Sequence, residues 1–259
     1  MIVHEILEKE MAPDVSIVIP VKDEDENIEI LANEIDASMS RVDYAWECIW
    51  IDDGSTDGTA TELIKLHDKH PRHRFVLLSR NFGQSAALVV GFQNAVGDII
   101  AMLDGDGQND PDDLPRLIEL LRKHEADMVN GVRQKRQDSV IRKISSRIAN
   151  RFRDWVTGDK ITDVGCSVRA FRAKCVKDIP MFKGMHRFFP TLIRIQGFSN
   201  IIESPVNHRP RIRGKTKYGV QNRLWVGLAD LMAVKWMQRR LVFPEVRSRS
   251  NAANSKEES

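Results

Sequence analysis

Cysteines, aromatic residues and long apolar runs are all scarce in this sequence. Its 259 residues include three cysteines, Cys48, Cys166 and Cys175. An odd number of cysteines without the spacing of a metal site excludes a disulfide scaffold and indicates a reduced, intracellular protein. No stretch reaches about 18 uninterrupted apolar residues, so we expect no membrane-spanning helix.

The overall composition excludes several other classes of protein. Residues 1–14 contain four acids and one lysine, which is not the composition of a secretory signal peptide. Hydrophobic residues make up 42% of the chain and charged residues 29%, with 15 glycines and 10 prolines, so the chain is neither collagen-like nor wholly disordered. Its length allows one substantial core and a small appendage, but not two full-sized domains.

The net charge of +2 conceals a strong division of charge along the chain. Residues 1–120 contain 9 basic and 25 acidic residues, whereas residues 121–259 contain 30 basic and 12 acidic ones. A mixed solvated surface does not divide charge in this way. We therefore expect the acidic half to hold a cation and the basic half to face phosphates or an anionic membrane.

Hydrophobic periodicity in the first half alternates between that of strands and that of helices. Buried strands are predicted at 15–20, 46–51, 75–78, 99–103 and 128–132. Helical patterns lie between them: a stripe of Ile28, Leu31, Ile35 and Met39, the ranges 59–70 and 84–96, and a stripe after Pro111. Asp25 is the predicted N-cap of the first helix, and Gly97 closes the third. The alternation predicts an α/β fold, with a mainly parallel central sheet and helices on both faces.

The pattern changes after residue 133. Residues 133–153 contain eight basic residues and one acid, and residues 207–223 contain six Lys and Arg and no acid. An amphipathic helix is predicted at 224–241, with Leu224, Leu228, Leu231 and Trp236 near one face. We expect four segments: an extension at 1–13, the main domain at 14–223, a surface or interface helix at 224–243 and a disordered tail at 244–259.

The segment DGDGQNDP directly follows the fourth predicted strand. Asp104 and Asp106 are one residue apart, so both carboxylates can face one divalent cation where the strand ends, and Gln108 adds a neutral oxygen. Such hard oxygen ligands suit Mg²⁺ or Mn²⁺. An EF-hand loop is excluded, because Asn109 and Pro115 stand where that loop needs Gly and Glu. The alternative is an ordinary Asp/Gly-rich turn.

Polar loops also follow the first three predicted strands. In IDDGSTDGT, a carboxylate of Asp52 or Asp53 can accept hydrogen bonds from the N–H groups of a base, and the loop also caps the next helix. The loop that begins at Arg80 has a glycine and a helix N-terminus behind it, which suit an anion or a ribose. The loop PVKDE alone indicates only an ordinary turn. Because ligands bind beyond the carboxyl ends of the strands in open parallel sheets, we expect the four loops to form one binding edge.

Basic side chains of the second half are candidate partners for phosphate. A guanidinium can donate two parallel hydrogen bonds to a phosphate. The candidates for one such site are Arg133, Arg142, Ser146 and Arg147. The segment DVGCSVR joins Asp163 to Arg169, and RIRGKTK has the composition of a flexible loop that closes over a diphosphate. Some of these basic residues can instead belong to an ordinary solvated surface that binds no phosphate.

Together these motifs resemble those of the family 2 inverting glycosyltransferases, and within that family the dolichol-phosphate-mannose-synthase-like group, which loads sugars onto polyprenyl phosphates. The resemblance covers residues 14–240. It rests on the order and spacing of eight segments: IVIPVKDE, IDDGSTDGT, SRNFGQSAA, DGDGQNDP, RKISSRIAN, DVGCSVRAF, GMHRF and RIRGKTKYG. It implies a Rossmann-like GT-A catalytic domain that binds a nucleotide-sugar and Mg²⁺ or Mn²⁺ and serves cell-envelope glycan biosynthesis.

The resemblance also implies roles for individual residues. The nucleotide-sugar is expected to contact Pro20, Glu24, Asp52, Asp53, Arg80, Asp104, Arg211 and Lys217. The metal ligands are expected to be Asp104, Asp106 and Gln108. The acceptor phosphate is expected to contact Arg133, Arg142 and Ser146. The expected catalytic residues are Asp106 and Asp163, and Arg211 and Lys217 are expected to clamp the diphosphate.

One departure from the family concerns the membrane. Many relatives append transmembrane helices and we expect none here, so a lipid acceptor requires attachment at the membrane surface. Basic residues near anionic lipid contribute on the order of 1 kcal/mol each, and Leu228, Leu231 and Trp236 are expected to lie in the interface. We expect a cytoplasmic protein held peripherally on the inner face of the cytoplasmic membrane. The alternative is that 224–241 packs on the core or on another subunit, and the sequence leaves a homo-oligomer open.

Three functions are compatible with these sequence features. In the first, an ionised polyprenyl phosphate attacks the sugar with inversion, the metal neutralises the leaving nucleoside diphosphate, and Asp163 orients the acceptor or acts as a base. In the second, the acceptor is a sugar hydroxyl, which requires a base such as Asp163 or Asp110. The third is a non-catalytic polyanion-binding module, which leaves the acidic loops unexplained and lacks aromatic stacking platforms, so no nucleic-acid partner is expected. The sequence leaves the sugar, the base (uracil or guanine) and the lipid length open.

Overall fold

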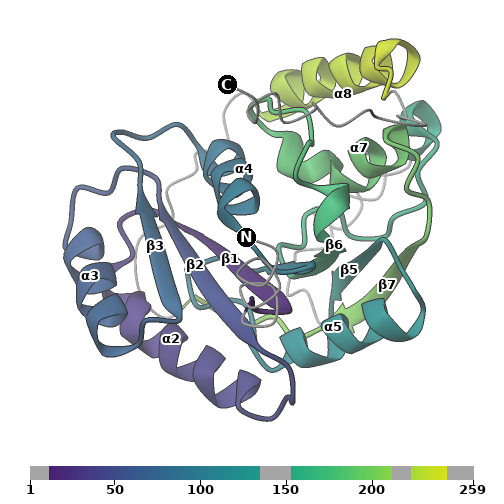
Figure 1. Ribbon diagram of the computed structural model, residues 1–259. Helices are drawn as coiled ribbons and strands as arrows, with labels where there is room; N and C mark the ends of the chain where they lie inside the picture. Colours follow the sequence, from purple (N-terminus) through teal and green to yellow (C-terminus); the bar gives the residue numbers. More distant parts are fainter. Residues whose placement is uncertain (1–11, 135–152, 212–222, 244–259) are drawn as a thin grey trace, which may run out of the picture.

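The computed structural model describes residues 12–134, 153–211 and 223–243. They contain a seven-stranded sheet of order β3-β2-β1-β4-β6-β5-β7, in which only β6 runs antiparallel to its neighbours (Figure 1). The strands are β1 (Val15–Val21), β2 (Trp46–Asp52), β3 (His73–Leu77), β4 (Ile99–Met102), β5 (Met128–Arg133), β6 (Arg169–Arg172) and β7 (Ile201–Val206). The helices are α2 (Asp25–Met39), α3 (Thr59–Lys69), α4 (Gln84–Asn94), α5 (Asp113–Lys123), α7 (Phe189–Ile195) and α8 (Arg223–Arg240), with short 3-10 turns at Ala173–Cys175 (η1) and Met185–Phe188 (η2).

Helices cover both faces of the sheet, because alternate residues of each central strand point to opposite sides. Ile17 and Ile19 of β1 belong to one core cluster, together with residues of α2, α3 and α5, whereas Val18 belongs to a second cluster with residues of α4, α7 and α8. The two sets of helices lie on opposite sides of the sheet (Figure 1). Trp50 of β2 is fully buried on the first side. The stripe predicted for the first helix, from Ile28 to Met39, is buried in the same cluster. The predicted mainly parallel α/β fold is therefore confirmed.

Two predicted helix boundaries are wrong in detail. Asp25 is the first residue of α2, and Glu24 occupies the N-cap position without a capping hydrogen bond from its side chain. Helix α4 already ends at Asn94, so Gly97 is not its closing residue. The close approach of β1 explains this glycine instead: a Cβ atom on Gly97 would lie 2.8 Å from the backbone nitrogen of Ser16.

Strands β6 and β7 have no counterpart among the strands predicted from the sequence. Strand β6 has only four residues, two of them arginines, and it inserts antiparallel between β4 and β5. Strand β7 contains Pro205, which lowers its strand propensity, but β7 lies at the edge of the sheet, where a missing N–H costs no ladder hydrogen bond.

Helix α8 lies within one residue of its predicted bounds, but the predicted single apolar face is wrong. It packs against α7, and its Leu231 and Val234 are buried in the second core cluster. Met232 and Trp236 are exposed on the other side. Leu231 and Trp236 therefore do not share one face. No helix in the described part of the chain is long and apolar enough to cross a membrane.

Candidate active site

The loops that follow β1, β2, β3 and β4 meet at one edge of the sheet, as expected for neighbouring parallel strands. The loops after β1 and β2 are joined by Lys22, whose Nζ donates to the carbonyl oxygen of Gly54 at 2.5 Å. The N-terminus of α4 reaches the loop after β4, since Gln84 Nε2 donates to Asp104 Oδ1 at 2.7 Å. Four polar loops that lie far apart in the sequence thus form one surface.

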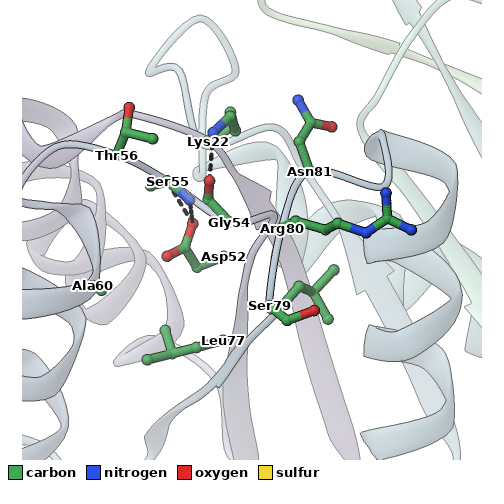
Figure 2. A pocket seen from close by; sticks show the side chains of 11 residues that line it. Lys22, Asp52, Gly54, Ser55, Thr56, Ala60, Leu77, Ser79, Arg80 and Asn81 are labelled. Atoms are coloured by element: carbon green, nitrogen blue, oxygen red, sulfur yellow. Dashed lines mark hydrogen bonds between the residues drawn. The ribbon is translucent and has the colours of Figure 1, made fainter.

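A pocket of about 530 Å³ opens between the loops after β2 and β3 (Figure 2). It is lined by Lys22, Asp52, Gly54, Ser55, Thr56, Ala60, Leu77, Leu78, Ser79, Arg80 and Asn81. Gly54 has φ +65°, and a Cβ atom there would lie 2.4 Å from the backbone carbon of Arg80, so the two loops can approach only because this residue is glycine. Both Asp52 and Arg80, predicted to contact the nucleotide-sugar, line the pocket.

The neighbouring acids Asp52 and Asp53 have different surroundings. Oδ1 of Asp52 accepts hydrogen bonds from the backbone N–H and the hydroxyl of Ser55, at the wall of the pocket (Figure 2). Both carboxylate oxygens of Asp53 accept backbone N–H groups of the next loop, from Phe82 at 2.7 Å and from Gly83 at 2.9 Å. Asp53 therefore holds the Arg80 loop in place, and Asp52 is the acid that faces the pocket.

Pro20 and Glu24, also predicted to contact the nucleotide-sugar, do not line this pocket. Pro20 is buried within β1. Glu24 is 7% exposed and accepts a hydrogen bond from Asn27 Nδ2 at 2.7 Å. Between these two, Asp23 adopts φ +44°, a conformation that Asp tolerates, and its carboxylate accepts the N–H of Thr56 at 2.7 Å. Asp23 thus ties the loop after β1 to the loop after β2.

The loop after β4 presents Asp104 and Asp106. The backbone N–H of Asp104 donates to Asn109 Oδ1 at 2.8 Å, and the N–H of Gln108 donates to Asp106 Oδ1 at 3.1 Å, so the loop is fixed by its own side chains. Burial, and then the charge of Asp106, raise the pKa of Asp104 to about 6. Two carboxylates held this close favour a bound cation.

A cationic side chain already contacts this site. Arg211 Nη2 donates to Asp106 Oδ2 at 2.6 Å, and Arg211 Nη1 donates to Glu24 Oε1 at 3.3 Å. No group of three or more His, Cys, Asp or Glu side chains within residues 12–134, 153–211 and 223–243 is arranged to hold a metal ion. Asp104 and Asp106 nevertheless fit Mg²⁺ or Mn²⁺ by the hardness of their oxygens, provided that a bound ligand supplies further oxygens.

Asp163 and Arg133 form a two-pronged ion pair. Arg133 Nε and Nη2 donate to the two carboxylate oxygens of Asp163 at 2.8 and 2.9 Å, and the N–H of Gly165 adds a further bond at 3.2 Å. Burial is the largest single influence on the pKa of Arg133 and acts to lower it. The hydrogen bonds and the charge of Asp163 act in the opposite direction, and the net effect is a raised pKa. The two residues predicted for acceptor binding and catalysis are thus brought together.

Arg169, which the sequence singles out only for its place in the segment shared with Asp163, is a central buried residue. Its guanidinium is buried and donates to Asn130 Oδ1 at 2.9 Å and to the carbonyl oxygens of Val164 and His186 at 2.5 and 2.8 Å. Burial lowers its pKa to about 10. Burial also lowers the pKa of His186 to about 3, so this imidazole is neutral near pH 7. The sequence signal for Arg169 is its place in the segment DVGCSVR, which does not show that its side chain is buried.

Several predicted site residues lie outside the described part of the chain. They are Arg142, Ser146 and Arg147 of the acceptor-phosphate candidates and Lys217 of the predicted clamp. The predicted tail at 244–259 and most of the extension at 1–13 also lie outside it.

Curated relatives carry names of lipid-linked sugar enzymes. The chain is 37% identical over 229 residues to a dodecaprenyl-phosphate galacturonate synthase of Rhizobium johnstonii, covering 87% of this chain and 68% of that protein. It is 38% identical over 205 residues to an undecaprenyl-phosphate 4-deoxy-4-formamido-L-arabinose transferase of Salmonella paratyphi A, covering 79% of this chain and 62% of that protein. The chain thus spans about two thirds of the length of these relatives.

Solved structures share the fold at low sequence identity. A glucosyl-3-phosphoglycerate synthase from Mycobacterium tuberculosis, in complex with Mn²⁺ and UDP-glucose, aligns with a TM-score of 0.61 at 18% identity over 91% of this chain and 82% of that one. A mannosyltransferase from Pyrobaculum calidifontis, in complex with GDP-mannose and Mn²⁺, aligns with a TM-score of 0.58 at 19% identity over 88% of this chain and 64% of that one. The expected GT-A fold is confirmed by these neighbours. The family model for glycosyl transferase family 2 matches residues 16–179, and the chain belongs to this family.

Proposed function

We propose that this protein transfers a sugar from a nucleotide-sugar to a polyprenyl phosphate, with inversion at the anomeric carbon. The observation that carries the proposal is that the pocket at Asp52 and the acids Asp104 and Asp106 lie at the same edge of the sheet, at the ends of β2 and β4, which both pair with β1. The names of the relatives, a dodecaprenyl-phosphate and an undecaprenyl-phosphate enzyme, support the choice of acceptor.

The pocket is the proposed site of the donor base, with Asp52 Oδ2 and the loop of Arg80 available to its polar edge. The diphosphate would then extend toward the loop after β4, where Asp104 and Asp106, with Gln108, would hold Mg²⁺ or Mn²⁺. A divalent ion there neutralises the negative charge that develops on the departing nucleoside diphosphate. Complexes of structural neighbours with Mn²⁺ and nucleotide-sugars support this assignment.

The acceptor phosphate is proposed to bind beside Arg133. Its ionised oxygen attacks the anomeric carbon from the side opposite the leaving diphosphate, so a new C–O bond forms as the bond to the diphosphate breaks. No proton has to be removed from this nucleophile. Asp163, whose two oxygens are occupied by Arg133, therefore orients the guanidinium and is not required as a base. Arg142 and Ser146 remain predicted partners of the same phosphate.

A sugar hydroxyl as acceptor is less well supported by the same geometry. That reaction needs a carboxylate free to take a proton. Asp163 is paired with Arg133, and Asp110 accepts hydrogen bonds from Arg209 Nη2 at 2.7 Å and Asn207 Nδ2 at 3.2 Å. Neither acid is arranged as a base, which favours the phosphate acceptor.

The decisive experiment compares two aspartates of the same segment. Asp106→Asn removes a proposed metal ligand, and Asp112→Asn alters an exposed acid that pairs with Arg41. With UDP- or GDP-sugars, Mn²⁺ and short polyprenyl phosphates, Asp106→Asn is expected to lose more than about a hundredfold in kcat/KM. Asp112→Asn is expected to keep the wild-type rate. Equal rates for both variants would refute the metal assignment, and transfer to soluble glycans but not to polyprenyl phosphate would refute the acceptor.

We propose a peripheral position on the cytoplasmic face of the membrane, where a polyprenyl phosphate and a nucleotide-sugar can meet. The outer side of α8 supports this: Met232 is 65% exposed and Trp236 60% exposed, close to Arg239 and Arg240 at the helix end. Tryptophan with neighbouring arginines suits the interface of an anionic membrane. The buried side of the same helix anchors this surface to the protein.

A further inference from the structure

We propose that Arg211 is an exchangeable counter-ion of the metal site: it neutralises Asp106 and Glu24 in the metal-free protein and is displaced when metal and nucleotide bind together. The inference rests on the proposed function, since it takes the Asp104–Asp106 pair as the metal site. The inference adds that one arginine of the basic half, Arg211, has different partners in the metal-free and the metal-bound protein.

The contacts of Arg211 are those of a cation between two acids. Its two terminal nitrogens donate to carboxylates on two different loops, 2.6 Å to Asp106 Oδ2 and 3.3 Å to Glu24 Oε1. The side chains are well shielded from water, with 24% of Arg211, 15% of Asp106 and 7% of Glu24 exposed. A charge-assisted bond in such surroundings is stronger than one on an open surface.

The backbone that leads to Arg211 is fastened to the metal loop. The N–H of Arg209 donates to the carbonyl oxygen of Gln108 at 2.8 Å, and residues Asn109 and His208 form an isolated antiparallel bridge. The side chain of Arg209 adds ion pairs to Glu34 at 2.8 Å and to Asp110 at 2.7 Å. The position of Arg211 over Asp106 therefore follows from several independent contacts, and Arg209 can stay fixed while Arg211 changes partner.

A dication and a guanidinium compete for the same oxygen of Asp106. Metal binding to the nucleotide-free protein must break the Arg211 bond, which weakens the apparent affinity. A nucleoside diphosphate offers Arg211 a new anionic partner with two acceptor oxygens, and so frees Asp106 for the metal. Because coupling between two ligands is reciprocal, metal must strengthen nucleotide binding by the same factor.

The test measures Mn²⁺ affinity by electron paramagnetic resonance, without activity as the readout. Full-length wild type, Arg211→Met and the control Arg41→Met, which removes an exposed ion pair to Asp112, are titrated with Mn²⁺ alone and then with UDP or GDP present. Without nucleotide, Arg211→Met is expected to bind Mn²⁺ at least about tenfold more tightly than wild type, because a competing charged hydrogen bond is gone. Arg41→Met is expected to match wild type.

Adding nucleotide is expected to tighten Mn²⁺ binding strongly in wild type and only weakly in Arg211→Met. An Arg211→Met protein that binds Mn²⁺ alone no more tightly than wild type, while wild type still couples Mn²⁺ to nucleotide, would overturn this inference and leave the proposed function standing. Absence of both Mn²⁺ and nucleotide binding in wild type would overturn both.

Discussion

Single residues at the sheet edge differ in role according to which hydrogen bonds already occupy them. Asp52 and Asp53 are adjacent, yet one faces the pocket and the other binds two backbone N–H groups of the next loop. Side chains of adjacent residues at a strand end point in different directions. Residue type and sequence position therefore do not show which of the two acids faces the pocket. The surroundings of each carboxylate decide its role.

The buried guanidinium of Arg169 is expected to contribute strongly to stability. Arg169→Met would leave three buried oxygens, on Asn130, Val164 and His186, without a donor. We expect the free energy of unfolding to fall by about 3 kcal/mol or more, measured by urea denaturation. Arg172→Met, which removes a single bond to the carbonyl oxygen of Ala126, serves as the control and is expected to cost about 1 kcal/mol. An unchanged midpoint for Arg169→Met would contradict this role.

The pKa of Asp104 predicts how metal binding depends on pH. The folded-state pKa is raised to about 6 from 3.8, so Asp104 is protonated at lower pH and cannot bind a cation there. Mn²⁺ affinity is expected to fall as pH decreases through about 6 and to level off above it. Mn²⁺ titrations at several pH values and constant ionic strength measure the metal affinity. An Mn²⁺ affinity that does not change with pH would contradict the role of Asp104 as a metal ligand.

The stability of the metal-free protein depends on pH in the opposite direction. The raised pKa makes the contribution of Asp104 to stability decrease as pH rises from 3.8 to about 6.

At the scale of elements, α8 has one buried side, one exposed side and a contact with the active-site region. Gly184, just before η2, has φ +92°, and a Cβ atom there would lie 2.7 Å from Asp230 Oδ2 of α8. The N–H of Gly184 donates to Ser85 Oγ, which is also bonded to His186 Nδ1 at 2.9 Å. Helix α8 therefore packs directly against the segment that holds His186.

The two sides of α8 are expected to respond differently to mutation. The double variant Met232→Ser with Trp236→Ala removes exposed apolar area and is expected to weaken binding to vesicles of anionic phospholipid by about tenfold or more, with little change in stability. Leu231→Ala creates a cavity in the core and is expected to cost about 2–5 kcal/mol of unfolding free energy. Vesicle sedimentation and urea denaturation measure the two effects. Unchanged vesicle binding of the double variant would rule out α8 as the docking surface.

At the scale of the whole molecule, the charge division of the sequence is partly neutralised by contacts between the halves. Arg209 pairs with Glu34 and Asp110, and Arg211 pairs with Glu24 and Asp106, so arginines of the basic half lie on acids of the acidic half. The acidic loops supply the pocket and the acid pair, while the basic half brings cations to their rim. A ligand bound at this junction contacts both halves.

Ligand binding at the junction is expected to stabilise the whole protein. With Mn²⁺ present and nucleotide at about 100 times its dissociation constant, linkage contributes about 2.7 kcal/mol, which corresponds to a rise of roughly 5–10 °C in Tm for a protein of this size. A thermal-shift comparison of UDP, GDP and ATP, each with and without Mn²⁺, measures the effect. The correct diphosphate is expected to need Mn²⁺ for its full shift, and equal shifts with EDTA would contradict metal-linked binding.

The sequence alone predicts the α/β architecture, because strand and helix periods alternate clearly and the buried stripes are long. It also placed four polar loops at strand ends, since in parallel strands these ends share one edge. Two short or interrupted strands were not predicted, because β6 has only four residues and β7 contains Pro205. Their pairing comes from sheet edges supplied by distant parts of the chain.

The pairing of the charged groups depends on long-range packing and is visible only in three dimensions. Arg133 meets Asp163 across 30 positions and Arg211 meets Asp106 across 105, distances over which no local pattern predicts contact. The same holds for the direction of Leu231 and Trp236 on α8, because a helix with apolar residues on several sides has no face until a neighbour covers one. Local propensity fixes elements, whereas long-range packing fixes which side chains meet.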